Sequence, residues 1–269
     1  MLNTLALSGA KMRGADFVNC YADAERAEAY SKLEFARTYY LAYRDLPAIF
    51  GDHVRGKAAI DFGCGAGRST RFLQRCGFDA VGIDISEEMI AKARQIDPGG
   101  DYRLIKDGDF SQFRAASCSL VLCAFTFDNI AGAEKKITLF GGLRNLLDDR
   151  GCIVNLVSSP EIYVNEWASF STRNFPENRS ARSGNVVRII TTDYPDRRPV
   201  EDILCTDESY QEIYREAGLQ TVATYKPLAT GREPYAWVNE TKIAPWVIYV
   251  LKSASSTTGS NNHSLAMPS

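Results

Sequence analysis

The stretch Asp61-Phe62-Gly63-Cys64-Gly65-Ala66-Gly67 leaves an apolar run of residues and continues into a polar run that begins with Arg68-Ser69-Thr70. Glycine lets a backbone turn tightly and approach a ligand closely, and a helix N-terminus after such a turn offers free N–H groups. The stretch therefore predicts a ligand-binding turn between the first strand and the first helix of an α/β unit.

Short β-rich runs alternate with helical patterns after this turn. The expected strands are 57–62, 79–84, 102–106, 119–124 and 152–158, followed later by 219–225 and 246–251. Helices are expected between them, including one that places Leu139, Leu143, Leu146 and Leu147 on one face. This alternation predicts an α/β fold with a mostly parallel sheet.

The other segments of the sequence are predicted to be additions to a single main domain. Residues 1–50 are expected to form an N-terminal helical cap, with a helical stretch at 15–50 laid across the open end of the sheet. The main domain is expected at 51–252, and its segment at about 159–206 has no clean period, which favours an inserted lid. The tail at 253–269 is rich in Ser, Thr, Asn and Gly and is expected to be disordered.

Composition excludes several classes of function. The 31 Lys and Arg residues nearly balance 33 Asp and Glu, so no basic excess favours nucleic acid. No run reaches the roughly 18 apolar residues of a membrane span, and the first ten residues lack a basic leader, so a cytoplasmic location without membrane contact is expected. Seven scattered cysteines without a CxxC pair, and two histidines, predict no metal site.

Two nucleotide-type ligands fit a glycine-rich turn of this kind. Asp84 ends the second strand, where a carboxylate accepts hydrogen bonds from ribose hydroxyls. A dinucleotide-binding turn also requires Gly or Ala where this chain has Arg68, and Asp61 would oppose a pyrophosphate but suits an ammonium group. A nicotinamide oxidoreductase thus stays the less favoured alternative.

Residues 61–67, with Asp84, resemble the first motif and the ribose-binding acid of class I S-adenosylmethionine-dependent methyltransferases. This resemblance implies a Rossmann-like seven-stranded sheet with an antiparallel last strand, helices on both faces, and a lid inserted after strand 5. It also implies that S-adenosylmethionine is the cofactor and S-adenosylhomocysteine the product. Lys106-Asp107-Gly108-Asp109-Phe110 is similar to the family's adenine-binding segment, and 122–130 to the segment near the sulfonium.

The chain is most similar to bacterial members that methylate small molecules, and it lacks the Asn-Pro-Pro-Tyr type motif of nucleic acid and protein enzymes. In such members a tyrosine of the N-terminal cap often lies over the cofactor. The residues predicted to bind the cofactor are Tyr21, Tyr30, Asp61, Gly63, Cys64, Gly65, Arg68, Asp84, Ile85, Met89, Asp107, Gly108, Asp109, Phe110, Ala124 and Phe125.

The acceptor site is predicted from the end of the fourth strand and from the lid. Because histidine is nearly absent, a carboxylate or tyrosine must serve as any general base, and Asp128 and Tyr30 are the candidates. Capping of the next helix by Asp128 and Asn129 is the alternative role. The residues predicted to contact the substrate are Phe127, Asp128, Tyr163, Glu166, Trp167 and Trp237, with plain packing of the lid as the alternative.

The function predicted from these observations is methyl transfer to a small-molecule acceptor by direct displacement, at oxygen, nitrogen or carbon. The alternative is a non-methylating protein of the same fold that binds S-adenosylmethionine. The tyrosine-rich N-terminal helices are compatible with a homodimer.

Overall fold

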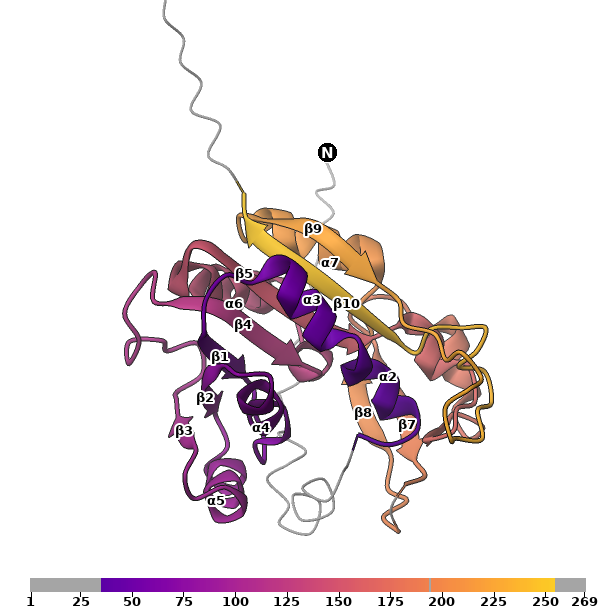
Figure 1. Ribbon diagram of the computed structural model, residues 1–269. Coiled ribbons are helices and arrows are strands. Elements are labelled where there is room, and N and C mark those ends of the chain that lie inside the picture. Colours follow the sequence, from indigo (N-terminus) through magenta and orange to yellow (C-terminus); the bar gives the residue numbers. More distant parts are fainter. Residues whose placement is uncertain (1–34, 194, 255–269) are drawn as a thin grey trace, which may run out of the picture.

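The computed structural model of the protein describes residues 35–193 and 195–254. A seven-stranded sheet is its centre (Figure 1). Its strands are β1 (Ala58–Phe62), β2 (Asp79–Asp84), β3 (Asp101–Leu104), β4 (Cys118–Ala124), β5 (Leu147–Ser158), β9 (Leu219–Tyr225) and β10 (Trp246–Ser253). Their order across the sheet is β3-β2-β1-β4-β5-β10-β9.

The direction of the strands matches the predicted Rossmann-like fold. Strand β1 pairs in parallel with both β2 and β4, whereas β10 runs antiparallel to both of its neighbours, β5 and β9. The chain order reverses between β2 and β4, so β1 ends at the switch point of the sheet, where ligands bind in open α/β folds. The glycine-rich turn therefore lies at this switch point.

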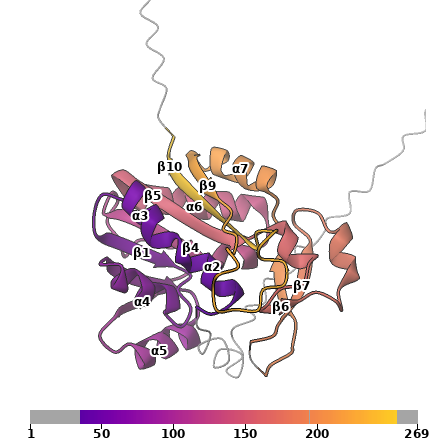
Figure 2. The same ribbon diagram turned by 45° about the vertical axis from the view of Figure 1, so that its right-hand side comes forward.

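Four helices that precede residue 100 cover one face of the sheet. They are α2 (Thr38–Arg44), α3 (Leu46–His53), α4 (Arg68–Arg75) and α5 (Glu87–Ile96). Ala59 and Leu120 of the strands pack there with Leu46 and Leu73. Helices α6 (Ala133–Leu146) and α7 (Asp207–Glu216) cover the opposite face, as Figure 2 shows. The alternation of side chains along each strand thus separates two cores.

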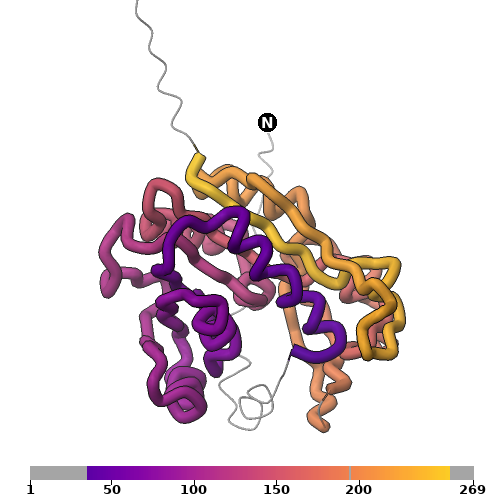
Figure 3. Tube along the Cα trace, viewed as in Figure 1, coloured from indigo at the N-terminus to yellow at the C-terminus, as the bar shows by residue number. Residues whose placement is uncertain are grey.

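Residues 35–53 are the described part of the predicted cap. They contain two short helices that meet at Asp45. Their apolar side chains pack on a face of the sheet, and Tyr39 of α2 reaches Phe125 after β4 and Trp246 at the start of β10. Figure 3 shows this segment beside the loop that leads into β10. Hydrogen bonds from Thr38 to Glu240 and from Arg44 to Leu228 join these two distant parts of the sequence.

Residues 159–206, predicted as a lid without regular structure, contain a small antiparallel sheet. Its strands are β6 (Phe170–Ser171), β7 (Val186–Thr191) and β8 (Val200–Ile203), accompanied by the 3₁₀ helices η2 (Pro160–Tyr163) and η3 (Pro176–Ser180). Val187 and Ile189 of β7 and Phe170 of β6 join the core beneath α2. The insertion is therefore packed onto the main domain.

One predicted helical residue belongs to a strand. Leu147 was expected on the third helix, but it begins β5 and pairs with Cys118 next to an irregularity in β4. A buried helix position and a buried strand position both require an apolar side chain, so periodicity does not separate them. Over the described residues, no helix combines the length and apolar character needed to cross a membrane.

Candidate functional site

The turn after β1 is held in a conformation that only glycine adopts readily. Gly63 has a φ of 71° and Gly65 a φ of 53°, both in the left-handed region. A Cβ atom on Gly63 would overlap the side chain of Thr126, whereas a Cβ on Gly65 would meet nothing within 4 Å. The backbone at Gly65 therefore borders open space that a ligand can approach.

Asp84, at the end of β2, is fixed beside this turn. Its Oδ2 accepts a hydrogen bond from the backbone N–H of Gly65 over 2.8 Å, and its Oδ1 accepts one from Ser86 over 2.9 Å. Burial raises the pKa of Asp84, and these backbone hydrogen bonds oppose that rise. The carboxylate is thus oriented before any ligand binds.

A pocket opens at this point. Asp84 and Asp107 both line it, and the Asp107 carboxylate is 2.6 Å from the Nζ of Lys135. We call it the cofactor pocket. It is lined by Phe62, Gly63, Gly65, Asp84, Ile85, Ser86, Met89, Ile105, Asp107, Ala124, Phe125, Thr126, Asn129, Ile130, Lys135 and Leu139.

Much of the remaining lining of the cofactor pocket is apolar. Met89 of α5, Leu139 of α6 and Ile105, just after β3, contribute to it. Ile85 also lies there and is 42% exposed although it is a large hydrophobic residue. A flat, weakly polar group would cover this surface.

Eight of the predicted cofactor residues line this pocket, and two line a smaller one next to it. The eight are Gly63, Gly65, Asp84, Ile85, Met89, Asp107, Ala124 and Phe125. The smaller pocket is lined by Cys64 and Arg68 together with Tyr43 and both pocket glycines. The Arg68 guanidinium lies 4.8 Å from the ring centroid of Tyr39 and 5.5 Å from that of Tyr43.

Asp61 does not reach the pocket. It is fully buried beneath the turn, and its Oδ2 accepts hydrogen bonds from the hydroxyls of Ser69 and Thr70, each over 2.6 Å. Its Oδ1 is buried without a hydrogen-bond partner among the described residues. Burial raises the pKa of Asp61 to about 6. The contacts described for Asp61 are therefore with the first turn of α4, which they stabilise.

Three other predicted cofactor residues, Gly108, Asp109 and Phe110, also lie outside the pocket lining, and their contact with the cofactor stays a prediction. Asp109 is exposed and accepts a hydrogen bond from the backbone of Ser111, and Gly108 beside it supplies a left-handed turn. Phe110 packs against Phe62, and its ring occupies the space that a side chain at Gly142 would take. Tyr21 and Tyr30 lie outside the described residues.

Several lining residues were missed from the sequence. Ser86 caps α5 through its hydroxyl, and Lys135 and Leu139 belong to α6. Their spacing of four residues places them on one face of the helix, a signal that a search limited to strand ends does not use. The other missed lining residues are Phe62, Ile105, Thr126, Asn129 and Ile130.

A second pocket, of about 480 Å³, lies between the end of β4 and the inserted sheet. It shares Phe125 and Asn129 with the cofactor pocket, so the two are neighbours at the 3₁₀ helix η1 (Thr126–Asn129). We call it the acceptor pocket. Its lining is Tyr39, Phe125, Asp128, Asn129, Ser158, Ile162, Tyr163, Phe170, Ile189, Thr191, Val200, Asp202 and Trp246.

Asp128 lies in the lining of the acceptor pocket, and it does not cap the next helix. Its Oδ2 accepts a hydrogen bond from the backbone N–H of Ser158 over 3.0 Å. Burial raises the pKa of Asp128 to about 6, opposed by Ser158 and by the charge of Lys136. The N-cap of α6 is Gly132, which rules out the alternative role proposed for Asp128.

The other predicted substrate residues divide into one that lines the pocket and four that do not. Tyr163 lines it, and its hydroxyl donates to Asp202 Oδ2 over 3.0 Å. Phe127 is fully buried and stacks on Phe140 at 3.8 Å, because η1 turns its ring toward α6. Phe127 is therefore a core residue that lines neither pocket.

Glu166, Trp167 and Trp237 hold the lid and the loop before β10. Glu166 accepts hydrogen bonds from Ser171 and Thr172, and the Trp167 indole N–H donates to the Ile162 carbonyl from a buried position. Trp237 donates to Glu233 Oε2 over 3.2 Å. These contacts match the packing alternative, and none of the three residues lines either pocket.

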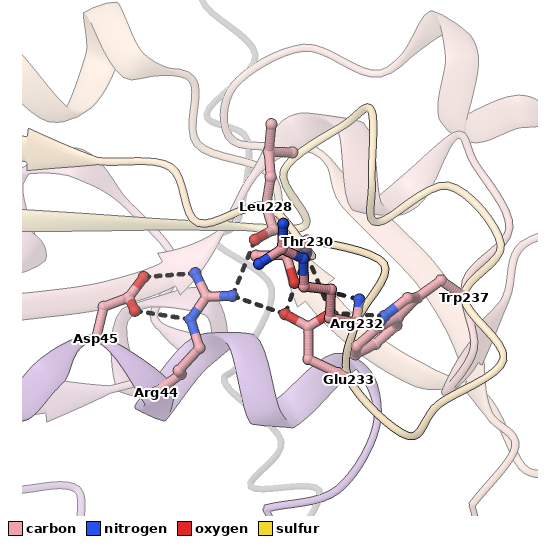
Figure 4. A network of polar contacts seen from close by, with 7 residues as sticks. All are labelled: Arg44, Asp45, Leu228, Thr230, Arg232, Glu233 and Trp237. Carbon is pink, nitrogen blue, oxygen red and sulfur yellow. Dashed lines mark hydrogen bonds and ion pairs between the residues drawn. The ribbon is translucent and has the colours of Figure 1, made fainter.

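Glu233 is the centre of the network drawn in Figure 4. It accepts hydrogen bonds from the backbone of Thr230 and from Arg44, whose guanidinium also makes a two-pronged ion pair with Asp45. Burial opposes ionisation, but the hydrogen bonds from Thr230 and Trp237 outweigh it and lower the pKa of Glu233 to about 2. The network fastens the loop before β10 to the end of α2.

Comparisons with known proteins agree with this geometry. Residues 60–154, which run from β1 through most of β5, match a family described as a methyltransferase domain. An uncharacterized methyltransferase of Geobacillus sp. (strain WCH70) is 30% identical over 130 residues. That match covers 45% of this chain and 58% of the relative, so it spans less than two thirds of the relative's length.

Solved structures show the same fold over most of the chain. The CcbJ methyltransferase of Streptomyces caelestis superposes with a TM-score of 0.56 at 16% identity, covering 80% of this chain and 96% of that one. An S-adenosylmethionine-dependent methyltransferase of Clostridium acetobutylicum gives a TM-score of 0.57 at 13% identity, covering 88% and 100%. At these identities the likeness concerns the fold.

Proposed function

We propose that the chain is a class I S-adenosylmethionine-dependent methyltransferase, and that it transfers a methyl group from this cofactor to a small molecule held in the acceptor pocket. The observation that carries the proposal is the wall shared by the two pockets. Phe125 and Asn129, at the end of β4, line both of them. A cofactor in one pocket and an acceptor in the other would therefore be neighbours at these two residues.

The residues present suit S-adenosylmethionine. The Asp84 carboxylate is already oriented by two backbone N–H groups, and its remaining lone pairs suit ribose hydroxyls. The exposed side chain of Ile85, with Met89 and Leu139, forms the apolar surface that an adenine ring would cover. The open space at Gly65 admits the rest of the molecule against the backbone.

Bound S-adenosylmethionine supplies a methyl carbon that is activated by a positively charged sulfur. The protein's own part is then to align the acceptor, exclude water and remove a proton where the acceptor carries one. The aromatic rings at the boundary of the pockets are nearly fully buried, which suits exclusion of water. Asp128 lies in the acceptor pocket and is the carboxylate we assign as proton acceptor.

Titration calorimetry with S-adenosylmethionine and S-adenosylhomocysteine tests the first half of the proposal. Micromolar binding of both is expected, and absence of binding would refute the proposal. A panel of small acceptors, with release of S-adenosylhomocysteine as the readout, tests the second half. Cofactor binding without turnover of any acceptor would instead favour a non-methylating protein of this fold.

A further inference from the structure

The short helix η1, at the boundary of the two pockets, follows a strained residue. Phe125 precedes η1 with a φ of 64°, in the left-handed region that a bulky side chain rarely adopts. Its backbone N–H donates to the Leu156 carbonyl over 2.8 Å, and its ring packs against Tyr39 and Trp246. Backbone strain of this kind persists where the surrounding structure enforces it, and it is concentrated at functional sites.

A buried lysine holds η1 from the neighbouring helix. Lys136 of α6 is 2% exposed, and its Nζ donates to the Phe127 carbonyl over 2.7 Å. The same Nζ lies 5.1 Å from the centroid of the Tyr210 ring. A positive charge removed from water is unfavourable unless an opposite charge compensates it. An apolar side chain would fill this position at lower cost, so the ammonium group itself calls for an explanation.

The residue after Phe127 carries the opposite charge. Asp128 is 5% exposed, and its Oδ2 accepts the backbone N–H of Ser158. Burial raises the pKa of Asp128 to about 6 and lowers the pKa of Lys136, whereas the charge of each residue opposes the effect of burial on the other. Each charge therefore favours the ionised form of its neighbour.

Other titratable groups surround this pair within the described part of the chain. They are Tyr163 of η2, Asp202 of β8, Cys205 after β8 and Tyr210 of α7. Burial raises the pKa of Cys205 to about 11 and raises those of both tyrosines well above their ordinary value, so these three groups are neutral near pH 7. Lys136 is the cation whose charge acts on Asp128.

We propose that Lys136 is a positioning residue for proton removal: it fixes η1 through the Phe127 carbonyl and keeps the neighbouring Asp128 carboxylate ionised. The inference rests on the proposed methyltransferase function, in which Asp128 is the proton acceptor. Lys136 belongs to the lining of neither pocket, so it acts through Asp128. The proton of the acceptor passes to the Asp128 carboxylate, and the electron pair of the broken bond stays on the acceptor, which becomes the nucleophile.

The ionisation of Asp128 is measurable without an acceptor. We would label the side-chain carboxyl of aspartate with ¹³C in the full chain and follow its NMR signals from about pH 4 to about pH 9. Asp128→Asn identifies the signal of Asp128, whose midpoint is expected at about pH 6. Lys136→Met is expected to raise this midpoint by about one pH unit or more. Lys57→Met, at an exposed position before β1, is the control and should leave it unchanged.

Lys136→Gln separates the charge from the hydrogen bond. Its amide can still donate to the Phe127 carbonyl but carries no charge, so the midpoint of Asp128 should again rise by about one pH unit. Binding of S-adenosylhomocysteine, measured by calorimetry, shows that a variant is folded. An unchanged midpoint in either folded variant would overturn the inference. Loss of folding in both would also overturn it, because Lys136 would then serve the core alone.

The proposed function fails by a different measurement. If the unaltered protein does not bind S-adenosylhomocysteine, that function is refuted and this inference with it, whatever the midpoint of Asp128. If the cofactor binds and the midpoint does not respond to Lys136, the inference alone is wrong.

Discussion

The hydroxyl of Thr38 donates a hydrogen bond to Glu240 Oε1 over 2.7 Å, across 202 positions of sequence. Glu240 is fully buried, and the same oxygen also accepts the backbone N–H of Ala168. Its Oε2 accepts the N–H groups of Val238 and Asn239. One carboxylate therefore joins the start of α2, the inserted segment and the loop before β10. Of these, α2 and the inserted segment line the acceptor pocket.

Replacement of Glu240 tests this junction. Glu240→Ala leaves four donors without their acceptor, and the free energy of unfolding is expected to fall by roughly 3 kcal/mol in urea titrations. Glu212→Ala is the control, because that side chain is 66% exposed on α7 and its loss should change stability by less than about 0.5 kcal/mol. Equal urea midpoints for Glu240→Ala and the unaltered protein would show that the junction contributes nothing.

Two glycines allow backbone strain to be separated from ligand contact. Gly65 and Gly77 both have positive φ, 53° and 88°, and both have open space where a Cβ would lie. Alanine at either position should cost about 1 kcal/mol of stability. Only Gly65 lines the cofactor pocket, so Gly65→Ala should weaken S-adenosylmethionine binding at least roughly tenfold in calorimetry, and Gly77→Ala less than twofold. Equal losses of affinity would contradict the placement of the cofactor.

The part of the site that sequence reasoning found depends on local patterns. The glycine turn and Asp84 were predictable because each follows directly from a strand whose end position is set by its apolar run. The acceptor pocket was not, since Tyr39, Phe170 and Trp246 come together only through packing of α2, the insertion and β10. Strand β7 lies in a segment that was expected to be irregular. Its burial alternates along the chain, with Val187, Ile189 and Thr191 buried, and this period of two is typical of a strand.

Asp84→Ala tests the oriented carboxylate. Hydrogen bonds to an ionised group contribute about 1.5–3 kcal/mol, so loss of this side chain should weaken S-adenosylmethionine binding by roughly 30-fold or more. Asp101→Ala, an acid at the exposed start of β3 that pairs with Arg103, should leave the affinity unchanged. An Asp84→Ala protein that binds as well as the unaltered one would remove Asp84 from the cofactor site.

Asp61 makes the stability of the protein depend on pH. Its pKa is about 6 in the folded state, because burial disfavours the charge and Asp84 adds to this effect while Arg68 opposes it. An unfolded aspartate loses its proton near pH 3.9, so between about pH 4 and 6 the folded state binds more protons and stability falls as pH rises. Asp61→Asn has no such titration.

The difference in unfolding free energy between Asp61→Asn and the unaltered protein isolates this effect. From pH 4 to pH 7, the free energy of unfolding of the variant relative to that of the unaltered protein should rise by about 1–3 kcal/mol, measured by urea titration at each pH. The hydroxyls of Ser69 and Thr70 donate equally well to an amide oxygen, so their bonds are kept. A difference that stays constant over this range would mean that Asp61 titrates normally.

Asp128 and Asp202 should affect turnover in different ways, once an acceptor that must lose a proton is found. A base must be ionised, so the rate should fall about tenfold per pH unit below the pKa of Asp128, about 6. The titratable groups whose charges act on it are Lys136, Tyr163, Cys205 and Tyr210. Burial keeps the tyrosines and the cysteine protonated across pH 5–8, so this limb belongs to Asp128.

Asp128→Asn should lower kcat by roughly 100-fold or more and abolish the acidic limb of the pH profile. Asp202→Asn should keep the limb, because Asp202 lines the same pocket without acting as the base. A kcat profile measured from pH 5 to 8 for the three proteins distinguishes the roles. An acidic limb that persists in Asp128→Asn would assign proton removal to another group, and a structural role alone for Asp128 would lower activity equally at every pH.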